Sequence, residues 1–524
     1  TVTASIVLSS SNLISIFFKI STGPLNLLRV LFYWRNNMAK AKTFFLDQHG
    51  CAKNQVDGEL IISRLEALGY VRVESADDAD LIIVNSCGFI ESAKKESLDS
   101  LLDARSAYPE KKIILAGCLA ERYAEVFEKD LPEADGIVGN GDLSLLDKAV
   151  KDVFSKSKKR PVFKAEQKGV FCGERTNLLS YKGSAFVKIT EGCDNCCSFC
   201  AIPLIRGRLR SRPVDEVIAE IKALLKKGIF EINLIGQDLA AYGCGIEDKG
   251  KFGRKDWHTV MYQDLKKPLV DEKDFTSDNG PTPLYSLVEK ISKIKGKFWV
   301  RLLYIHPDHF DTNVLELIKK DERILPYFDI PFQSGDDEII HAMNRKGSFK
   351  SYAKLVRTIR KELPESCIRT TFLTGFPGEK EENAENTKKF LETIKSDWSG
   401  CFDYSKEDDT PAYKMKGQVA HRTAVARAND LSAIQHEITQ SLLRKRVGKV
   451  YDVLVEEIVQ NLEGTDEGLA IGRAWFEAPE VDGNVVIRYD LDDRNAVKKI
   501  VPGAVVKVKA AASSEVDIDG FYVG

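Results

Sequence analysis

The chain lacks the features that mark secreted scaffolds and membrane proteins. Eleven cysteines in 524 residues are too sparse for a disulfide framework. Apolar runs stay short of the roughly 18 residues that a membrane helix needs, because Lys19, Ser21 and Arg29 interrupt the longest of them. The formal net charge is only -2, so the charge of the whole chain favours neither a polyanion binder nor an acidic tail. We therefore expect a cytoplasmic, globular protein of about three domains, with no membrane partner.

Acidic residues are also absent from the first 37 positions, which are rich in Ser, Leu, Ile and Phe. Met38 stands just before the first clearly patterned segment. One interpretation is upstream sequence translated ahead of a start at Met38, and the other is a transit peptide or an export signal. We favour the first, and we expect residues 1–40 to be an extension outside the fold.

Between residues 41 and 155, short apolar runs alternate with helix-like segments, which predicts an N-terminal open parallel α/β domain. Three of these runs lead directly into a cysteine, namely Cys51, Cys87 and Cys118. The carboxyl ends of parallel strands meet at one edge, where α/β sheets bind ligands, so we expect the three thiols to converge. Each one alone could equally be a buried structural cysteine.

A second β/α series is expected at residues 185–443, after a basic linker without periodicity at 156–184. Five or six units predict a full or partial β/α barrel, with its active site at the carboxyl ends of the strands. The charged stretch 244–283 breaks the rhythm and is interpreted as a surface insertion. Residues 444–524 carry short alternating runs, which predict a small all-β barrel.

The segment EGCDNCCSFCAIP brings four cysteines together: Cys193, Cys196, Cys197 and Cys200. Soft thiolates on a tight loop suit an iron–sulfur cluster. In C-x3-C-x2-C spacing, Cys193, Cys197 and Cys200 would give a four-iron cluster three ligands and leave one iron open to chelate S-adenosylmethionine. The two C-x2-C pairs could instead bind zinc, although zinc ribbons place roughly 15 to 20 residues between such pairs. Buried structural cysteines are the third interpretation.

The aromatic residue before the last cysteine, in CCSFCAIP, makes this loop similar to that of the radical S-adenosylmethionine (SAM) superfamily. HGCAKNQVDGE, LIIVNSCGFIESAKKES and ILAGCLAERY resemble the N-terminal domain of its methylthiotransferases. The resemblance continues in order through GRLRSRP, LIGQDLAAYG, PFQSGDDEIIHAMNRKG and RTTFLTGFPGE. The C-terminal module resembles a TRAM domain, so the resemblance runs from about residue 43 to the end of the sequence.

The resemblance implies a transferase with two 4Fe-4S clusters, a partial TIM-like radical SAM barrel, and SAM as a cofactor. Two sets of cysteines match the family's ligands: Cys51, Cys87 and Cys118 for the auxiliary cluster, and Cys193, Cys197 and Cys200 for the radical cluster. Cys196 occupies a variable position in the family. One SAM methylates sulfur associated with the auxiliary cluster, and a second is cleaved to a radical that removes a hydrogen from the substrate. An electron donor and a sulfur donor are expected partners.

Residues that contact SAM are not fixed by a motif in this sequence. Candidates lie at strand ends that face the expected site: Gln237, Asp238, Gly375, Pro377, Gly378 and Glu379.

Two branches of the family differ in substrate. One adds a methylthio group to the β-carbon of an aspartate in small-subunit ribosomal protein S-twelve, and the other, the MiaB type, modifies an adenosine of transfer RNA. Residues 450–524 contain 7 Lys and Arg against 15 Asp and Glu. Binding to phosphates favours a basic module, whereas an acidic one complements a basic ribosomal protein. The acidic face could also serve only as a solvated surface.

Motif details are divided between these branches. LIGQDLAAYG, YFDIPFQ and GRAWFEAPEVDG resemble the ribosomal-protein branch, whereas Ser334 in PFQSGDDE matches the transfer-RNA branch. We predict the ribosomal protein, or the small ribosomal subunit, as the substrate, and keep transfer RNA as the alternative. A remote non-enzymatic alternative is a zinc-stabilised RNA-binding adaptor, which would be colourless.

Overall fold

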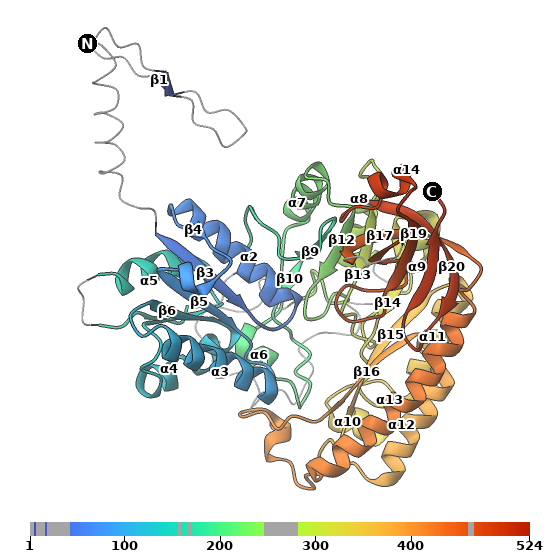
Figure 1. Cartoon of the computed structure of the whole chain (residues 1–524). Coiled ribbons are helices and arrows are strands. Elements are labelled where there is room, and N and C mark those ends of the chain that lie inside the picture. Colours follow the sequence, from blue (N-terminus) through green and yellow to red (C-terminus); the bar gives the residue numbers. More distant parts are fainter. Residues whose placement is uncertain are drawn as a thin grey trace.

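The computed structural model describes residues 42–155, 159–165, 169–245, 281–459 and 466–524 (Figure 1). It also gives the backbone of an antiparallel pair, Ser5–Ile6 (β1) with Ile16–Phe17 (β2). Most of the predicted extension 1–40 and of the predicted insertion 244–283 lies outside the described residues. Within the described ranges, every helix is too short or too polar to cross a bilayer.

The N-terminal domain is a parallel sheet between helices, as predicted. Its strand order is β4-β3-β5-β6-β7-β8. The strands are Thr43–Gln48 (β3), Val71–Arg72 (β4), Leu81–Ser86 (β5), Lys112–Gly117 (β6), Gly136–Gly139 (β7) and Val162–Phe163 (β8). The helices are Ala52–Ala67 (α2), Glu91–Ala107 (α3), Cys118–Asp130 (α4) and Leu146–Val153 (α5), with short 3-10 turns at Ala76–Asp78 and Leu143–Leu145. All of β5 is buried, because helices cover both faces of a parallel sheet.

Strand β8 lies within residues 156–184, which are predicted to be a linker. It extends the N-terminal sheet by pairing with β7, with Ile137 opposite Val162. Two residues are too few to show the alternation that identifies a strand in a sequence.

The central domain is an open, six-stranded parallel sheet in the order β16-β15-β14-β13-β12-β9. The strands are Ser184–Lys188 (β9), Glu231–Ile235 (β12), Trp299–Leu302 (β13), Ile324–Asp329 (β14), Cys367–Thr374 (β15) and Trp398–Asp403 (β16). A hairpin of Thr190–Glu191 (β10) and Arg210–Ser211 (β11) encloses Ile202–Arg206 (α6). Of the two predicted forms, a full or a partial β/α barrel, the open sheet confirms the partial barrel.

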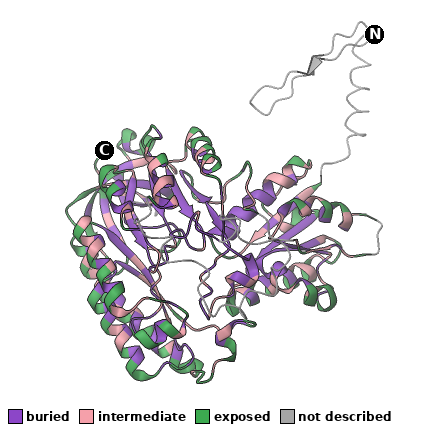
Figure 2. Cartoon of the chain, turned by 180° about the vertical axis from the view of Figure 1, so that it is seen from behind, coloured by how far each residue is buried: buried purple, intermediate pink, exposed green. Residues whose placement is uncertain are grey.

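Helices on the outside cover this partial barrel. They are Val214–Lys226 (α7), Pro283–Ser292 (α8), Val314–Lys320 (α9), Asp337–Ala342 (α10), Phe349–Glu362 (α11), Glu381–Ile394 (α12) and His421–Arg444 (α13), with a 3-10 turn at Pro411–Lys414. Figure 2 shows the strands buried and the outer faces of these helices exposed. The predicted limits of the linker and of the domains stay predictions.

The C-terminal module is a closed barrel of five strands, which confirms the predicted all-β module. Its strands are Val450–Val459 (β17), Glu467–Arg473 (β18), Val485–Asp490 (β19), Val505–Ser513 (β20) and Ile518–Tyr522 (β21), with a helix at Arg494–Lys499 (α14).

Buried charges fix this module against the amino ends of the barrel strands. Glu231, the first residue of β12, accepts hydrogen bonds from Arg301 at 2.9 Å and Arg473 at 2.6 Å. The Phe476 carbonyl accepts hydrogen bonds from the first residues of β15 and β16, Cys367 and Trp398. The opposite, carboxyl end of the strands is thereby left for the functional site.

Candidate active site

Cys51, Cys87 and Cys118 follow three neighbouring strands, β3, β5 and β6, at their carboxyl ends. Two glycines let their loops touch. A Cβ added to Gly50 would lie 3.0 Å from the Cβ of Cys87, and one added to Gly88 would lie 2.7 Å from the carbonyl carbon of Cys118. The predicted convergence of the three loops at one sheet edge is thus observed.

The three thiols influence one another electrostatically. Burial raises the pKa of Cys118 to about 12, Arg206 opposes this rise, and Cys87 and Cys51 add to it. Cys51 is exposed, yet desolvation by the surrounding protein raises the pKa of its thiol. The cations of Lys53 and Arg206 and nearby backbone amides act more strongly in the opposite direction, so the pKa is lowered overall. Positive charge therefore favours a thiolate at Cys51, which is the form that binds iron, whereas burial raises the pKa of Cys87 and of Cys118.

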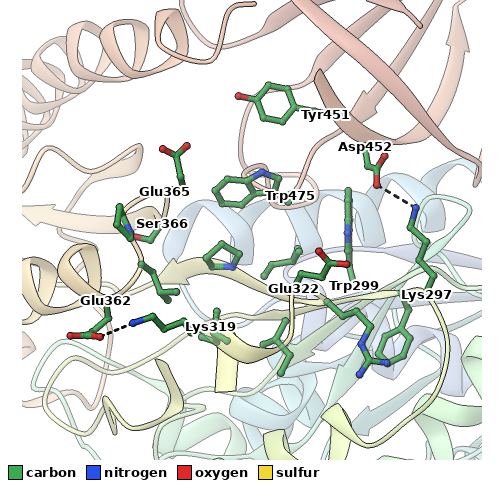
Figure 3. A pocket seen from close by; sticks show the side chains of 18 of the residues that line it. Lys297, Trp299, Lys319, Glu322, Glu362, Glu365, Ser366, Tyr451, Asp452 and Trp475 are labelled. Carbon is green, nitrogen blue, oxygen red and sulfur yellow. Dashed lines mark hydrogen bonds and ion pairs between the residues drawn. The ribbon is translucent and has the colours of Figure 1, made fainter. Parts of the chain in front are cut away.

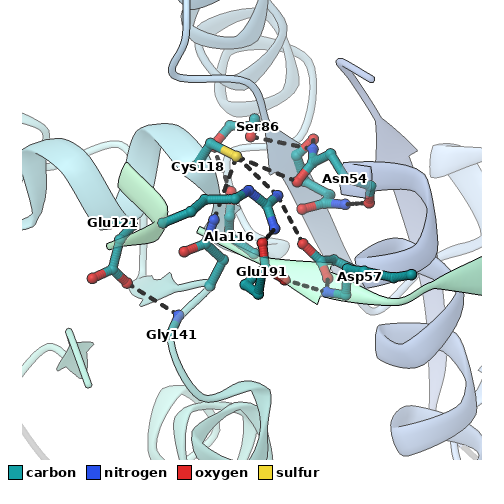
Figure 4. A network of polar contacts seen from close by, with 12 residues as sticks. Asn54, Asp57, Ser86, Ala116, Cys118, Glu121, Gly141 and Glu191 are labelled. Atoms are coloured by element: carbon teal, nitrogen blue, oxygen red, sulfur yellow. Dashed lines mark hydrogen bonds and ion pairs between the residues drawn. The ribbon is translucent and has the colours of Figure 1, made fainter. Parts of the chain in front are cut away.

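Cys118 also receives hydrogen bonds of the kind that surround cluster sulfurs (Figure 4). Arg206 Nη2 donates to its Sγ at 3.1 Å and Asn140 Nδ2 at 3.4 Å. Hydrogen bonds to the sulfurs are among the features that set the potential of an iron–sulfur cluster. The residues around this edge therefore fit a cluster ligated by thiolates.

Arg206 belongs to a buried ionic network that joins the two α/β domains (Figure 4). Its guanidinium contacts Asp57 of α2 at 2.9 Å and Glu191 of β10 at 2.8 Å. Lys188 of β9 contacts the same two carboxylates, each at 2.6 Å. Burial opposes ionisation of Glu191, but Arg206 and Lys188 hold its pKa well below the usual range.

The second set, Cys193, Cys197 and Cys200, lies on the loop between β10 and α6. Gly192 begins this loop with a φ of +76°, and a Cβ there would lie 2.0 Å from the carbonyl oxygen of Arg208. The Cys193 amide donates to the Gly207 carbonyl at 3.1 Å, which closes the base of the loop. The loop therefore holds its cysteines in a confined arc.

The thiols of the second set also affect the pKa of one another. Burial raises the pKa of Cys193 well above its ordinary value, and Asp238, Cys197 and Cys200 raise it further. Cys196 has a left-handed backbone, with a φ of 49°, and its carbonyl accepts a hydrogen bond from Asn344 Nδ2 at 3.0 Å. Among the described residues, no group of three or more Cys, His, Asp or Glu side chains is arranged to hold a metal ion. The ligand roles therefore stay predictions.

Sequence reasoning missed the residues that hold this loop in place. Asn195 Nδ2 donates to Asp238 at 2.8 Å, and the His309 ring nitrogen lies 2.7 Å from Asn195 Oδ1. His306 stacks on His309 and places its Nε2 3.9 Å from Cys197 Sγ. The YIHPDH segment after β13 stands at a strand end, which is the one signal that could have pointed to these histidines.

The residues predicted to contact SAM differ in whether their side chains already form hydrogen bonds within the protein. Asp238 is committed to the cysteine loop, and Glu379 accepts from Gly375 N at 2.9 Å and Arg427 at 2.8 Å. Gln237 donates to Glu191 at 3.3 Å, while its buried Oε1 has no partner in the described part of the chain. Gln237 is thus the candidate with a free polar atom, whereas Pro377 and Gly378 offer only backbone.

A separate cavity of about 760 Å³ lies at the opposite end of the barrel, against the C-terminal module (Figure 3). Trp299, Tyr451 and Trp475 line it, and its facing charges pair as Lys319 with Glu362 and Lys297 with Asp452. None of its lining residues is a cysteine. The thiol-bearing edge is therefore the stronger candidate for chemistry.

Three family models match successive parts of the chain. They are described as uncharacterized protein family UPF0004 at residues 43–139, the radical SAM superfamily at 187–391, and a TRAM domain at 447–523.

Known proteins are similar over nearly the whole chain. The ribosomal protein uS12 methylthiotransferase RimO of Treponema denticola is 48% identical over 491 residues, covering 91% of this chain and 100% of that protein. The protein of the same name from Carboxydothermus hydrogenoformans is 35% identical, covering 92% and 99%. The solved radical SAM methyltransferase TsrM of Kitasatospora setae reaches a TM-score of 0.47 at 12% identity, covering 71% of this chain and 75% of that one, which is too distant to support an inference. By its identity to full-length relatives and its three matched domains, the chain belongs to the RimO family of radical SAM methylthiotransferases.

Proposed function

We propose that this protein adds a methylthio group to the β-carbon of an aspartate in ribosomal protein uS12. Identity of 48% to a full-length RimO supports this substrate. The charge of the C-terminal module also supports it, because 15 acidic residues against 7 basic ones between 450 and 524 suit a basic protein better than an RNA.

One contact carries the structural part of the proposal. Arg206 lies six residues after Cys200 in the sequence, yet its guanidinium donates to the Sγ of Cys118 at 3.1 Å. Helix α6, which follows one set of thiols, therefore touches a thiol of the other set directly. A reaction that needs both sets at one substrate requires such closeness.

We assign Cys51, Cys87 and Cys118 to an auxiliary 4Fe-4S cluster, and Cys193, Cys197 and Cys200 to the radical cluster. When bound, the radical cluster supplies the electron for reductive cleavage of SAM, and the auxiliary cluster supplies the sulfur to be methylated. Asn195 and Asp238 hold the radical loop in place, and Gln237 offers its free Oε1 to SAM. The enzyme would work in the cytoplasm, with an electron donor and a sulfur donor as partners.

An anaerobic assay with both candidate substrates tests the proposal. The reconstituted protein is given SAM, a reductant, and either uS12 or unmodified transfer RNA, and mass spectrometry detects the methylthio addition. We expect modification of uS12 at an aspartate. Modification of transfer RNA alone would reverse the substrate assignment.

Single cysteine variants test the ligand sets. Cys197→Ala should abolish SAM cleavage and Cys196→Ala should not, because only Cys197 belongs to the proposed set. Cys87→Ala should keep SAM cleavage but lose methylthio transfer. Equal behaviour of the Cys196 and Cys197 variants would show that the ligand set is wrong.

A further inference from the structure

Lys53 is a cation from the N-terminal domain that reaches the barrel. It lies two residues after Cys51, in the first turn of α2, and is only 6% exposed. Its Nζ stands 3.6 Å from the centre of the Tyr304 ring, in the loop after β13. Because this loop follows the carboxyl end of a barrel strand, Lys53 lies at the edge where chemistry is expected.

The ammonium of Lys53 differs from nearby buried cations in its pairing. Lys188, Arg206 and Arg301 each contact a carboxylate within 3 Å. For Lys53, no carboxylate in the described ranges lies within salt-bridge distance. The Cys51 thiolate is its anionic neighbour, and the proposed cluster takes up that sulfur. A buried cation that has no carboxylate partner can still bind an anion that arrives with the substrate.

The carboxylates at longer range are already engaged. Asp329 accepts a hydrogen bond from the Tyr304 amide at 3.1 Å and faces Arg369 at 3.8 Å. Glu191 is held by Arg206 and Lys188. Neither carboxylate therefore serves as the partner of Lys53.

Tyr304 holds an unusual backbone conformation beneath this ammonium. Its φ of 65° lies in the left-handed region, which non-glycine residues rarely adopt. Such conformations concentrate at functional sites. The ring gives Lys53 a cation–π contact that orients the ammonium without neutralising it.

We propose that Lys53 binds the side-chain carboxylate of the substrate aspartate and so presents the β-carbon beside the auxiliary thiols. The inference rests on the proposed function, since it names the group that recognises the aspartate. It also gives a reason for substrate choice, because an adenosine base offers no anion to this ammonium.

Binding measurements with two forms of uS12 test the inference. The probes are fluorescently labelled uS12 and the same protein with its target Asp replaced by Asn, which has the same shape without the charge. The holoenzyme with both clusters should bind the Asp form about 10- to 100-fold more tightly, as expected for one charge-assisted contact. Lys53→Gln should reduce this preference to within about twofold, and Lys53→Arg should retain most of it.

Lys95 is an exposed lysine on α3, and Lys95→Gln is the matched control. This variant should bind the two forms of uS12 as the unchanged protein does. Iron content and the electron paramagnetic resonance signal of each variant show whether its clusters are intact. A Lys53→Gln enzyme that keeps the full preference overturns the inference. A variant that loses the preference only together with its iron also overturns it, and leaves Lys53 as a counter-charge for Cys51.

The unchanged enzyme provides a test that needs no variant. Equal affinity for the Asp and Asn forms would overturn the role of Lys53 while leaving the proposed function intact. Absence of both binding and modification of uS12 would instead overturn the proposed function, and the role of Lys53 with it.

Discussion

Arg206→Gln should weaken the junction between the two α/β domains and the auxiliary set of thiols together. Arg206 is 3% exposed, and its guanidinium makes three contacts, with Asp57, Glu191 and Cys118 Sγ. Glutamine is uncharged and shorter, so it replaces none of these three charge-assisted contacts.

The size of the effect follows from the charges that remain. Asp57 and Glu191 keep Lys188 at 2.6 Å, so the network changes from two cations with two anions to one cation with two anions. Breaking a buried pair by removing one partner costs about 3–5 kcal/mol. Because Lys188 still compensates part of the charge, we expect a loss near 3 kcal/mol, or roughly 6–12 °C in a unit of 150–250 residues.

Thermal unfolding of the cluster-free protein measures this loss, and a double variant provides the control. Arg206→Gln with Asp57→Asn removes one cation and one anion, so it should recover much of the stability. In the reconstituted protein, loss of the cation beside Cys118 should also shift the reduction potential of the proposed auxiliary cluster to more negative values, while that of the proposed radical cluster stays unchanged. The explanation by uncompensated charge would be refuted if Arg206→Gln unfolded at the same temperature as the unchanged protein. It would also be refuted if the double variant were less stable than Arg206→Gln alone.

Three further changes probe other parts of the molecule. Gly88→Ala places a Cβ 2.7 Å from the Cys118 carbonyl, so we expect loss of about half of the bound iron with SAM cleavage retained; full iron content would contradict the loop packing. Arg473→Met leaves the fully buried Glu231 with Arg301 alone, and should cost about 3–5 kcal/mol in thermal unfolding; no loss would show that the C-terminal module docks without this pair. Burial raises the pKa of Glu477 from 4.5 to about 8. The folded protein therefore holds this proton more tightly than the unfolded chain does, so the stability that Glu477 contributes is complete below about pH 4.5 and is lost as the pH rises towards 8. Glu477→Gln should therefore gain stability relative to the unchanged protein, by up to about 1.4 kcal/mol per pH unit across that range; parallel pH profiles in urea unfolding would refute it.

The positions of the thiols were predictable because they depend on strand ends. Each cysteine of the first set follows an apolar run, and parallel topology brings such ends to one edge. The tight C-x3-C-x2-C spacing needs no tertiary information at all. Domain order and the all-β character of the C-terminal module likewise follow from local periodicity.

Partners far apart in the sequence were not predictable. Glu379 is predicted from the sequence as a SAM contact, but it pairs with Arg427 of α13, which only the fold brings near. Asp238 is similarly taken up by Asn195 and the His306 amide. β16 is hard to recognise as a strand in the sequence, because Trp398–Asp403 contains Ser, Gly and Asp among its apolar residues.

Helix α2 shows most clearly where a sequence pattern misleads and why that matters for function. Its polar residues suggest a solvent-exposed face, yet every residue from Ala52 to Ile62 is buried. A helix buried all round lies between layers, and here the polar face meets the barrel. Asp57 contacts Lys188 and Arg206, and Glu59 contacts Arg175 at 2.5 Å.

The same helix begins directly after Cys51 and carries Lys53 in its first turn. One rigid element therefore sets the distance between an auxiliary thiol, the proposed aspartate-binding ammonium and the ionic contacts to the barrel. A helix rises 1.5 Å per residue with fixed angular spacing, so these three groups cannot shift independently. Because chemistry between the two proposed cluster sites would depend on placement to within about 1 Å, docking through α2 would let the two α/β domains act on one substrate.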